Sequence, residues 1–130
     1  MMHEQILKFA KDNNAEIFTL LEELCNIPAP SHFEHARAQY CKNYLESIGA
    51  QGVYIDEVQN VIFPLSCENS GEITVFAAHT DTVFPDTEPM PYFDDGEKVH
   101  SPAVADDTAS VVVLLLMAKY FIKQNIKPPK

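Results

Sequence analysis

The sequence predicts an α/β domain in which a layered, mostly parallel sheet is flanked by helices. Apolar residues at helical spacing occupy the first part of the chain, and short β-branched and aromatic runs follow them. A six-residue apolar run then precedes a long apolar helix. At 130 residues the chain can form one hydrophobic core, so we expect one domain over residues 1–130.

Two helices are predicted before any strand. The first covers residues 4–26, where the apolar positions recur at helical spacing: Ile6, Ala10, Ile17, Leu20, Leu21 and Leu24. The pair Asn13-Asn14 is expected to loosen this helix. Pro28 and Pro30 end it, because proline lacks the backbone N–H that a helix needs.

The second helix is predicted over residues 32–47. Ser31 followed three residues later by Glu34 is the pattern of a capping box at its start. Gly49 stands just past its end, where glycine is favoured. The apolar face is expected to carry Ala36, Tyr40, Tyr44, Leu45 and Ile48.

Short strands are predicted at residues 53–55 and 61–63, around a turn near Gln59-Asn60. Residues 73–78 are apolar except for Thr74, which is typical of a parallel strand covered on both faces. Three prolines then interrupt the chain. A hairpin is predicted beyond them, with its turn at Asp94-Asp95-Gly96.

The last predicted element is a helix over residues 105–124. Its valines at 111–113 would also suit a strand, but the length and the Asp-Asp-Thr start favour a helix. A buried parallel strand followed by a helix needs a partner strand, and the chain stops where that strand would begin. We therefore expect the N-terminal part of a larger fold, truncated or completed by another chain. The unpaired sheet edge would favour self-association.

The composition of the chain limits the kinds of molecule that it is expected to bind and the compartment in which it is expected to lie. The formal net charge of −10 disfavours nucleic acid and anionic membranes, which attract basic surfaces. Three cysteines without C-x-x-C spacing argue against a structural zinc knot and a disulfide framework. No signal peptide is evident, and the longest apolar run, residues 111–118, is too short to span a bilayer. The expected location is the cytoplasm.

His79 and Asp81 follow the apolar run, and Asp106 and Asp107 open the last predicted helix. Zinc binds neutral imidazole nitrogen and carboxylate oxygen, and a pair of zinc ions needs a bridging carboxylate. His79 would supply the imidazole, Asp81 would hold its other ring nitrogen, and Asp106 or Asp107 would bridge. Taken singly, His-x-Asp is more often a solvated pair and Asp-Asp a helix cap. Together, at the tips of one strand–helix unit, they favour a metal site.

These motifs resemble those of the zinc-dependent peptidase and deacylase family that includes peptidase T, glutamate carboxypeptidases, acetylornithine deacetylase and aminoacylases. Residues 78–83 (Ala-His-Thr-Asp-Thr-Val) are similar to its first signature and residues 105–107 to its second. Ile27-Pro28-Ala29-Pro30-Ser31 and Tyr44-Leu45 also resemble its N-terminal region, so the similarity covers nearly the whole chain.

The resemblance implies an incomplete N-terminal part of a zinc-peptidase catalytic domain. It implies that His79 binds one of two zinc ions, that Asp106 bridges both, and that Asp81 is the catalytic residue that orients His79. Asp107 would be accessory. Cobalt or manganese are alternatives to zinc. The substrate would be a small peptide or an N-acyl amino acid.

The chain also departs from the family. His100-Ser101-Pro102-Ala103 stands where a glycine-rich turn is usual, and the family's Glu-Glu pair, further ligands and inserted domain belong to later sequence. We therefore expect a fragment of a zinc-dependent hydrolase of peptide or N-acyl amide bonds, with half of the di-metal site and no activity alone. The alternative is a non-catalytic α/β interaction module that keeps a relict metal site.

Overall fold

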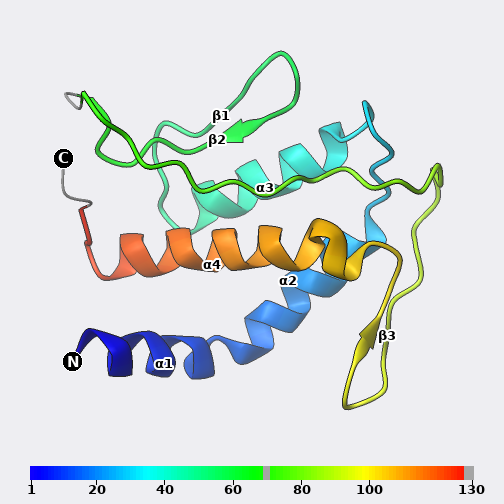
Figure 1. The fold of residues 1–130 in the computed structure, drawn as a ribbon, viewed down its shortest axis with the longest axis horizontal. Helices are drawn as coiled ribbons and strands as arrows, with labels where there is room; N and C mark the ends of the chain where they lie inside the picture. The colour runs from blue at the N-terminus through cyan, green and yellow to red at the C-terminus, as the bar shows by residue number, and fades with distance from the viewer. Residues whose placement is uncertain (69–70, 128–130) are drawn as a thin grey trace.

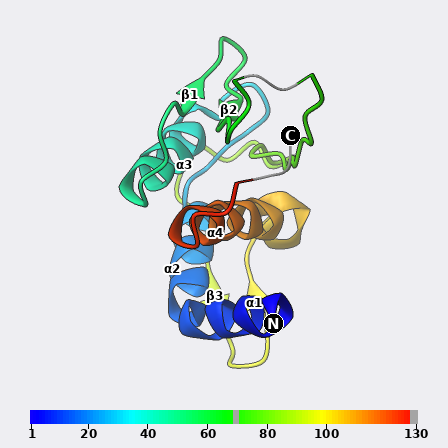
Figure 2. The ribbon, with the colours of Figure 1, turned by 90° about the vertical axis from the view of Figure 1, so that its left-hand side faces the viewer.

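The computed structural model describes residues 1–68 and 71–127. A long helix, α4 (Ala109–Lys123), crosses the middle of the molecule. Helix α3 (His35–Ser47) lies on one side of it, and α1 (Met2–Asp12) and α2 (Asn14–Asn26) lie on the other (Figures 1 and 2). The molecule is thus built of helices around α4, with two small hairpins attached.

The core fills the space between α2, α3 and α4. The buried positions of α4 follow helical spacing, at Val111, Val112, Leu115, Leu116 and Tyr120. The helix prediction for the three valines is therefore confirmed. The buried residues of α4 pack against buried side chains of the two neighbouring helices: Leu20, Leu21, Leu24 and Cys25 of α2, and Cys41 and Leu45 of α3.

The predicted loosening at Asn13-Asn14 is confirmed as a break between α1 and α2. Asn13 has φ −105° and ψ 13°, and its side-chain nitrogen donates to the carbonyl of Phe9 at 2.8 Å. The backbone N–H of Asn13 donates to the same carbonyl at 3.0 Å, so both the main chain and the side chain of Asn13 bond to the last turn of α1. The chain then turns into α2, which contributes to the core, whereas α1 has no buried residue.

Helix α3 begins at His35, later than the predicted start. Ser31 makes no cap, because its hydroxyl bonds elsewhere, and Glu34 accepts from the backbone N–H of His32 at 2.7 Å. The end of the helix is as expected. Gly49 has φ +101°, and the N–H of Ala50 donates to the carbonyl of Leu45 at 2.9 Å, which closes the last turn.

The face of α3 that enters the core is mostly the expected one, and it is wider. Leu45 and Ile48 are buried, and Tyr40 and Tyr44 pack against the core, whereas Ala36 is exposed. Arg37, Ala38 and Cys41 are buried as well. An arginine therefore takes a core position that an apolar pattern does not reveal.

Two hairpins are confirmed at the expected places, and both are antiparallel. Strand β1 (Tyr54–Ile55) pairs with β2 (Val61–Ile62), and β3 (Phe93–Asp94) pairs with β4 (Val99–His100). In the first hairpin, Asp56 accepts from the N–H groups of Val58 and Asn60 at 3.0 and 2.8 Å. A carboxylate that binds the turn's own backbone stabilises such a short loop.

Residues 73–78 differ from the buried strand that their composition predicts. They run extended beside the helices (Figure 1), yet Ile73, Val75 and Phe76 are 64%, 73% and 60% exposed. A strand needs a hydrogen-bonded neighbour, and within the described residues no strand is assigned at 73–78; the nearest bridge, between Pro30 and Thr82, lies beyond the segment. The layered, mostly parallel sheet stays a prediction.

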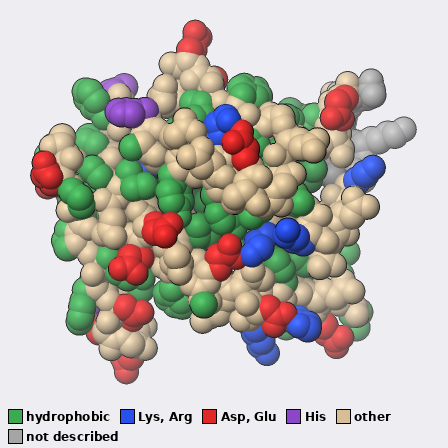
Figure 3. Space-filling model, turned by 180° about the vertical axis from the view of Figure 1, so that it is seen from behind, with side chains coloured by type: hydrophobic (Ala, Val, Ile, Leu, Met, Phe, Trp, Pro, Cys, Tyr) green, Lys and Arg blue, Asp and Glu red, His purple; other side chains and the backbone are tan. Residues whose placement is uncertain are grey.

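Apolar side chains also reach the surface on the opposite face, the one seen from behind (Figure 3). No helix within residues 1–68 and 71–127 has the length and apolar character that crossing a bilayer requires.

Candidate metal centre

The structure brings the two sequence motifs together at one end of α4. His79 Nε2 lies 3.0 Å from Asp106 Oδ1, and the backbone N–H of His79 donates to Asp107 Oδ2 at 3.2 Å. Two consecutive aspartates thus hold one histidine, the first by its ring and the second by its backbone. The motifs that the sequence separates by 27 residues form one cluster in space.

The local backbone before α4 makes this double contact possible. The π-type turn η1 (Val104–Thr108) precedes the helix, and within it Asp106 and Asp107 have φ −131° and −129°, outside the helical range. The peptide bond between them is cis. The helix itself begins at Ala109, later than predicted, and neither aspartate caps it. Because neither aspartate caps α4, both carboxylates are available to the His79 segment.

Asp81 holds the other side of the imidazole. His79 Nδ1 lies 3.0 Å from Asp81 Oδ1 and 3.2 Å from the Asp81 carbonyl oxygen. With a proton on Nδ1, the ring donates to Asp81 and leaves Nε2 as the atom that can bind a metal. The His79, Asp81 and Asp106 side chains are 52%, 34% and 79% exposed, so a solute can reach them.

Burial acts against hydrogen bonding and charge on the pKa values of this pair. Burial lowers the pKa of His79, but hydrogen bonds to Asp106 and Asp81 outweigh it and raise the pKa above its ordinary value. The pKa of Asp81 is lowered, first by the hydroxyl of Ser31 and then by His79. The carboxylate of Asp81 therefore stays ionised, as a partner of the imidazole must.

Arg37 lies beneath the cluster and is 1% exposed. Its Nε donates to the carbonyl of Ile27 at 2.8 Å, and its Nη1 donates to the carbonyl of Thr80 and to the hydroxyl of Thr108, each at 3.1 Å. Thr80 separates His79 from Asp81, and Thr108 follows Asp107. One guanidinium therefore links the backbone of the first motif to the second.

Sequence reasoning missed three residues that build this cluster. Ser31 was expected as a helix cap, and its hydroxyl instead donates to Asp81 Oδ2 at 2.5 Å. Arg37 and Thr108 belong to no sequence motif that indicates a metal site. A signal for Arg37 exists in its spacing, since it shares the four-residue period of Cys41 and Leu45 on the buried face of α3.

His100 does not join the cluster. It belongs to the hairpin β3–β4, where its Nε2 lies 2.8 Å from Asp95 Oδ2.

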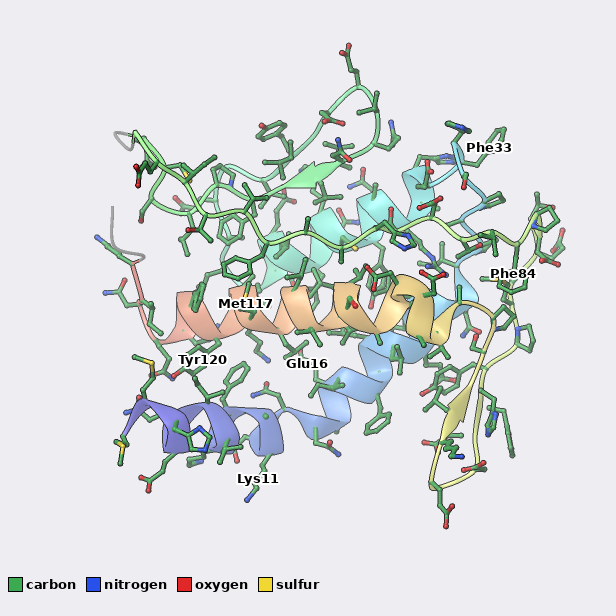
Figure 4. The ribbon with its side chains drawn as sticks, in the orientation of Figure 1. Lys11, Glu16, Phe33, Phe84, Met117 and Tyr120 are labelled. Atoms are coloured by element: carbon green, nitrogen blue, oxygen red, sulfur yellow. The ribbon has the colours of Figure 1, made fainter. Side chains whose placement is uncertain are left out.

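An open hollow adjoins Asp106, and its lining is mostly apolar: Val83, Phe84, Ser101, Ala103, Val104 and Ala105. Figure 4 shows Phe33 and Phe84 at this same end of the molecule.

The donor atoms fit one part of a zinc centre. An imidazole nitrogen and a carboxylate oxygen converge from two segments, and a second carboxylate holds the other imidazole nitrogen. Across residues 1–68 and 71–127, no group of three or more His, Cys, Asp or Glu side chains is placed to hold a metal ion. A complete zinc site would need ligands besides His79 and Asp106.

No protein-family model matches the chain. The chain is similar to a protein of Pyrobaculum aerophilum described as a "Putative LysW-lysine/LysW-ornithine hydrolase". The two are 33% identical over 110 residues, which cover 85% of this chain and 30% of that protein. The chain thus spans less than a third of the length of the relative it matches. The similarity supports the broad hydrolase family that the motifs resemble, and it does not single out any of the members named above.

Proposed function

We propose that this chain supplies part of a zinc-dependent hydrolase that cleaves peptide or N-acyl amide bonds of small substrates. In this proposal the chain carries half of a di-metal site, with His79 and Asp106 as ligands and Asp81 as the residue that orients His79. The chain alone does not turn over substrate, because a general base and further ligands must come from elsewhere.

The observation that carries the proposal is the convergence of His79 Nε2 and Asp106 Oδ1 at 3.0 Å while Nδ1 is held by Asp81. A solvated His-x-Asp pair would have no reason to meet a second motif. A helix-capping Asp-Asp pair would bond to the first turn of α4, and here it does not. The alternatives that suit each motif singly therefore explain the cluster poorly.

Each residue has a defined chemical task in the proposed site. Asp81 keeps one proton of the ring on Nδ1, so that Nε2 would present its lone pair to a metal once it is free of the proton in its contact with Asp106. Asp106 has two carboxylate oxygens, and in the proposed site it would bridge the two metal ions with them. Asp107 holds the backbone of His79 at 3.2 Å and so fixes the spacing of the two ligands. The chemistry that bound zinc supplies is acidification of a water molecule and polarisation of the scissile carbonyl.

Similarity to the Pyrobaculum protein supports the hydrolase part of this proposal, since that protein's description names a hydrolase. The part concerning zinc rests on the donor atoms alone.

The test is zinc binding by the purified 130-residue chain, measured by competition with a chromogenic chelator. We expect weak binding at one ion per chain, lost in His79→Ala and in Asp106→Asn. His100→Ala is the matched control, because His100 pairs with Asp95 in the hairpin outside the cluster. We also expect no zinc-dependent cleavage of dipeptides or N-acyl amino acids by the chain alone.

Binding that survives in His79→Ala would refute the metal site and favour the alternative, a non-catalytic interaction module. The exposed apolar segment around Val75 and Phe76 is the observation in favour of that alternative. Cleavage of a dipeptide by the purified chain would contradict the proposal that half a site is inactive.

A further inference from the structure

Both carboxylate oxygens of Asp81 are engaged. Oδ1 lies 3.0 Å from His79 Nδ1, and Oδ2 accepts the hydroxyl of Ser31 at 2.5 Å. A carboxylate bound at one oxygen can still rotate about its side-chain torsions, whereas one bound at both oxygens to separate segments has a single arrangement. Ser31 therefore restricts the group that orients the imidazole.

The backbone holds Ser31 in place for this contact. Residues 29–31 run alongside residues 81–82, where a parallel bridge joins Pro30 to Thr82. The N–H of Thr82 donates to the carbonyl of Ala29 at 2.7 Å, and Ala29 and Thr82 are 0% and 3% exposed. A buried backbone bond next to the Ser31–Asp81 pair positions both side chains before they meet.

The turn that follows Ser31 also favours this use of the hydroxyl. The N–H of Phe33 donates to the carbonyl of Pro30 at 2.8 Å, and His32 has φ +73°. This tight turn carries the chain away before α3 begins at His35, so the hydroxyl of Ser31 is too early to cap the helix. It is directed at Asp81 instead.

The four side chains form one continuous series, Ser31–Asp81–His79–Asp106. We infer that Ser31 is a positioning residue, which fixes the Asp81 carboxylate and through it the ring of His79. This inference rests on the proposed function for its metal consequence. Its structural part, the restraint on Asp81, stands without a metal.

The first measurement is made on the zinc-free chain. Three-bond NMR couplings to the carboxyl carbon of Asp81 report its χ1 angle. We expect couplings of a single rotamer in the original chain, averaged couplings in Ser31→Ala, and single-rotamer couplings again in Ser31→Thr, which keeps the hydroxyl. A role of Ser31 in folding alone would change thermal stability and leave the Asp81 couplings as they were.

The second measurement is zinc affinity on the same variants. Loss of an outer partner of a metal-bound histidine typically costs about 10–100-fold in affinity, and we expect about tenfold for Ser31→Ala with recovery in Ser31→Thr. Ser47→Ala is the control, since Ser47 is also exposed but bonds to the carbonyl of Tyr44 within α3. We expect it to change neither readout.

Single-rotamer couplings of Asp81 in Ser31→Ala would overturn the inference, whatever the zinc affinity. If zinc binding is unaffected by His79→Ala, the proposed function fails, and the couplings still decide the role of Ser31. The two failures are therefore distinguishable.

Discussion

Arg37 and Thr108, 71 residues apart, are joined by a hydrogen bond of 3.1 Å between two side chains that are each 1% exposed. Burial lowers the pKa of Arg37, and neighbouring groups, including Asp81, act in the opposite direction. Within the described residues, Nη2 of this guanidinium has no hydrogen-bond partner. The bonds that Arg37 does make connect the end of α2, the His79–Asp81 segment and the start of α4.

We expect Thr108→Val to lower the free energy of unfolding by about 1–2 kcal/mol, because an isosteric side chain without the hydroxyl leaves a buried charged donor with one acceptor fewer. Urea denaturation monitored by circular dichroism would measure this change. Thr19→Val is the control, since Thr19 is exposed on α2 and bonds to Ala15 of its own helix. It should change stability by no more than about 0.5 kcal/mol. Equal losses in the two variants would contradict a special role for the Arg37 contact.

Lys119 of α4 crosses to α2, where it pairs with Glu16 and donates to the side-chain oxygen of Asn13 at 2.8 Å. Figure 4 shows Glu16 where α2 passes α4. The Lys119 and Glu16 side chains are 19% and 32% exposed, so water screens them only in part. This pair joins the break between α1 and α2 to the central helix.

We expect Lys119→Met to cost about 1–2 kcal/mol of unfolding free energy. Hydrogen bonds to charged groups contribute about 1.5–3 kcal/mol, and the partial exposure of this pair reduces that contribution. Lys8→Met is the matched control. Lys8 pairs with Asp12 at 2.5 Å, but these side chains are 76% and 57% exposed, and exposed pairs of this spacing contribute about 0.3–0.5 kcal/mol. A larger loss at Lys8 than at Lys119 would contradict the argument from burial.

Local sequence patterns predicted most of the helices and hairpins of the fold. Helical spacing, prolines and turn residues act within a few positions, so α2, α4 and both hairpins were predictable, as was the break at Asn13. The apolar run at residues 73–78 misled for a physical reason. Composition reports what a segment would bury if it had neighbours, and within the described residues no strand pairs with residues 73–78, so Ile73, Val75 and Phe76 stay exposed.

The residues of the cluster that belong to a recognisable motif were predictable, and those that belong to none were not. His79 and Asp81 lie in one motif and Asp106 in the other, and the structure places the two motifs together. Ser31 reaches Asp81 across 50 residues, and Arg37 reaches Thr108 across 71. No local rule predicts either contact, and the cap position suggested a different partner for Ser31.

The three cysteines should differ sharply in reactivity. Cys25 and Cys41 are buried and Cys67 is exposed. Burial raises the pKa of both buried thiols, that of Cys41 to about 11, so little thiolate forms there near neutral pH. We expect one thiol per native chain to react rapidly with a disulfide reagent at pH 8, and three after denaturation. Rapid labelling that persists in Cys67→Ser would contradict the burial of the other two.

The carboxylate of Asp95 binds several donors in the hairpin β3–β4, and a pH dependence of the hairpin follows from it. Asp94 also accepts, from the N–H of Gly96 at 2.8 Å. Asp95 accepts from His100 Nε2 at 2.8 Å and from the N–H groups of Lys98 and Glu97 at 2.7 and 2.8 Å. These bonds, that of His100 first, lower the pKa of Asp95 to about 2. Since an unfolded aspartate has a pKa of about 3.9, the folded hairpin favours the ionised form.

The contribution of Asp95 to hairpin order is therefore complete above about pH 4 and is lost as the pH falls through about 2. We expect the amide proton shifts of Glu97 and Lys98 to titrate with a midpoint nearer 2 than 4, while circular dichroism of the same samples reports whether the helices persist. In Asp95→Asn the transition near pH 2 should disappear from both amides, since the carboxylate that accepts their N–H groups is gone. A midpoint at or above the ordinary aspartate value would show that the carboxylate gains nothing from its three donors.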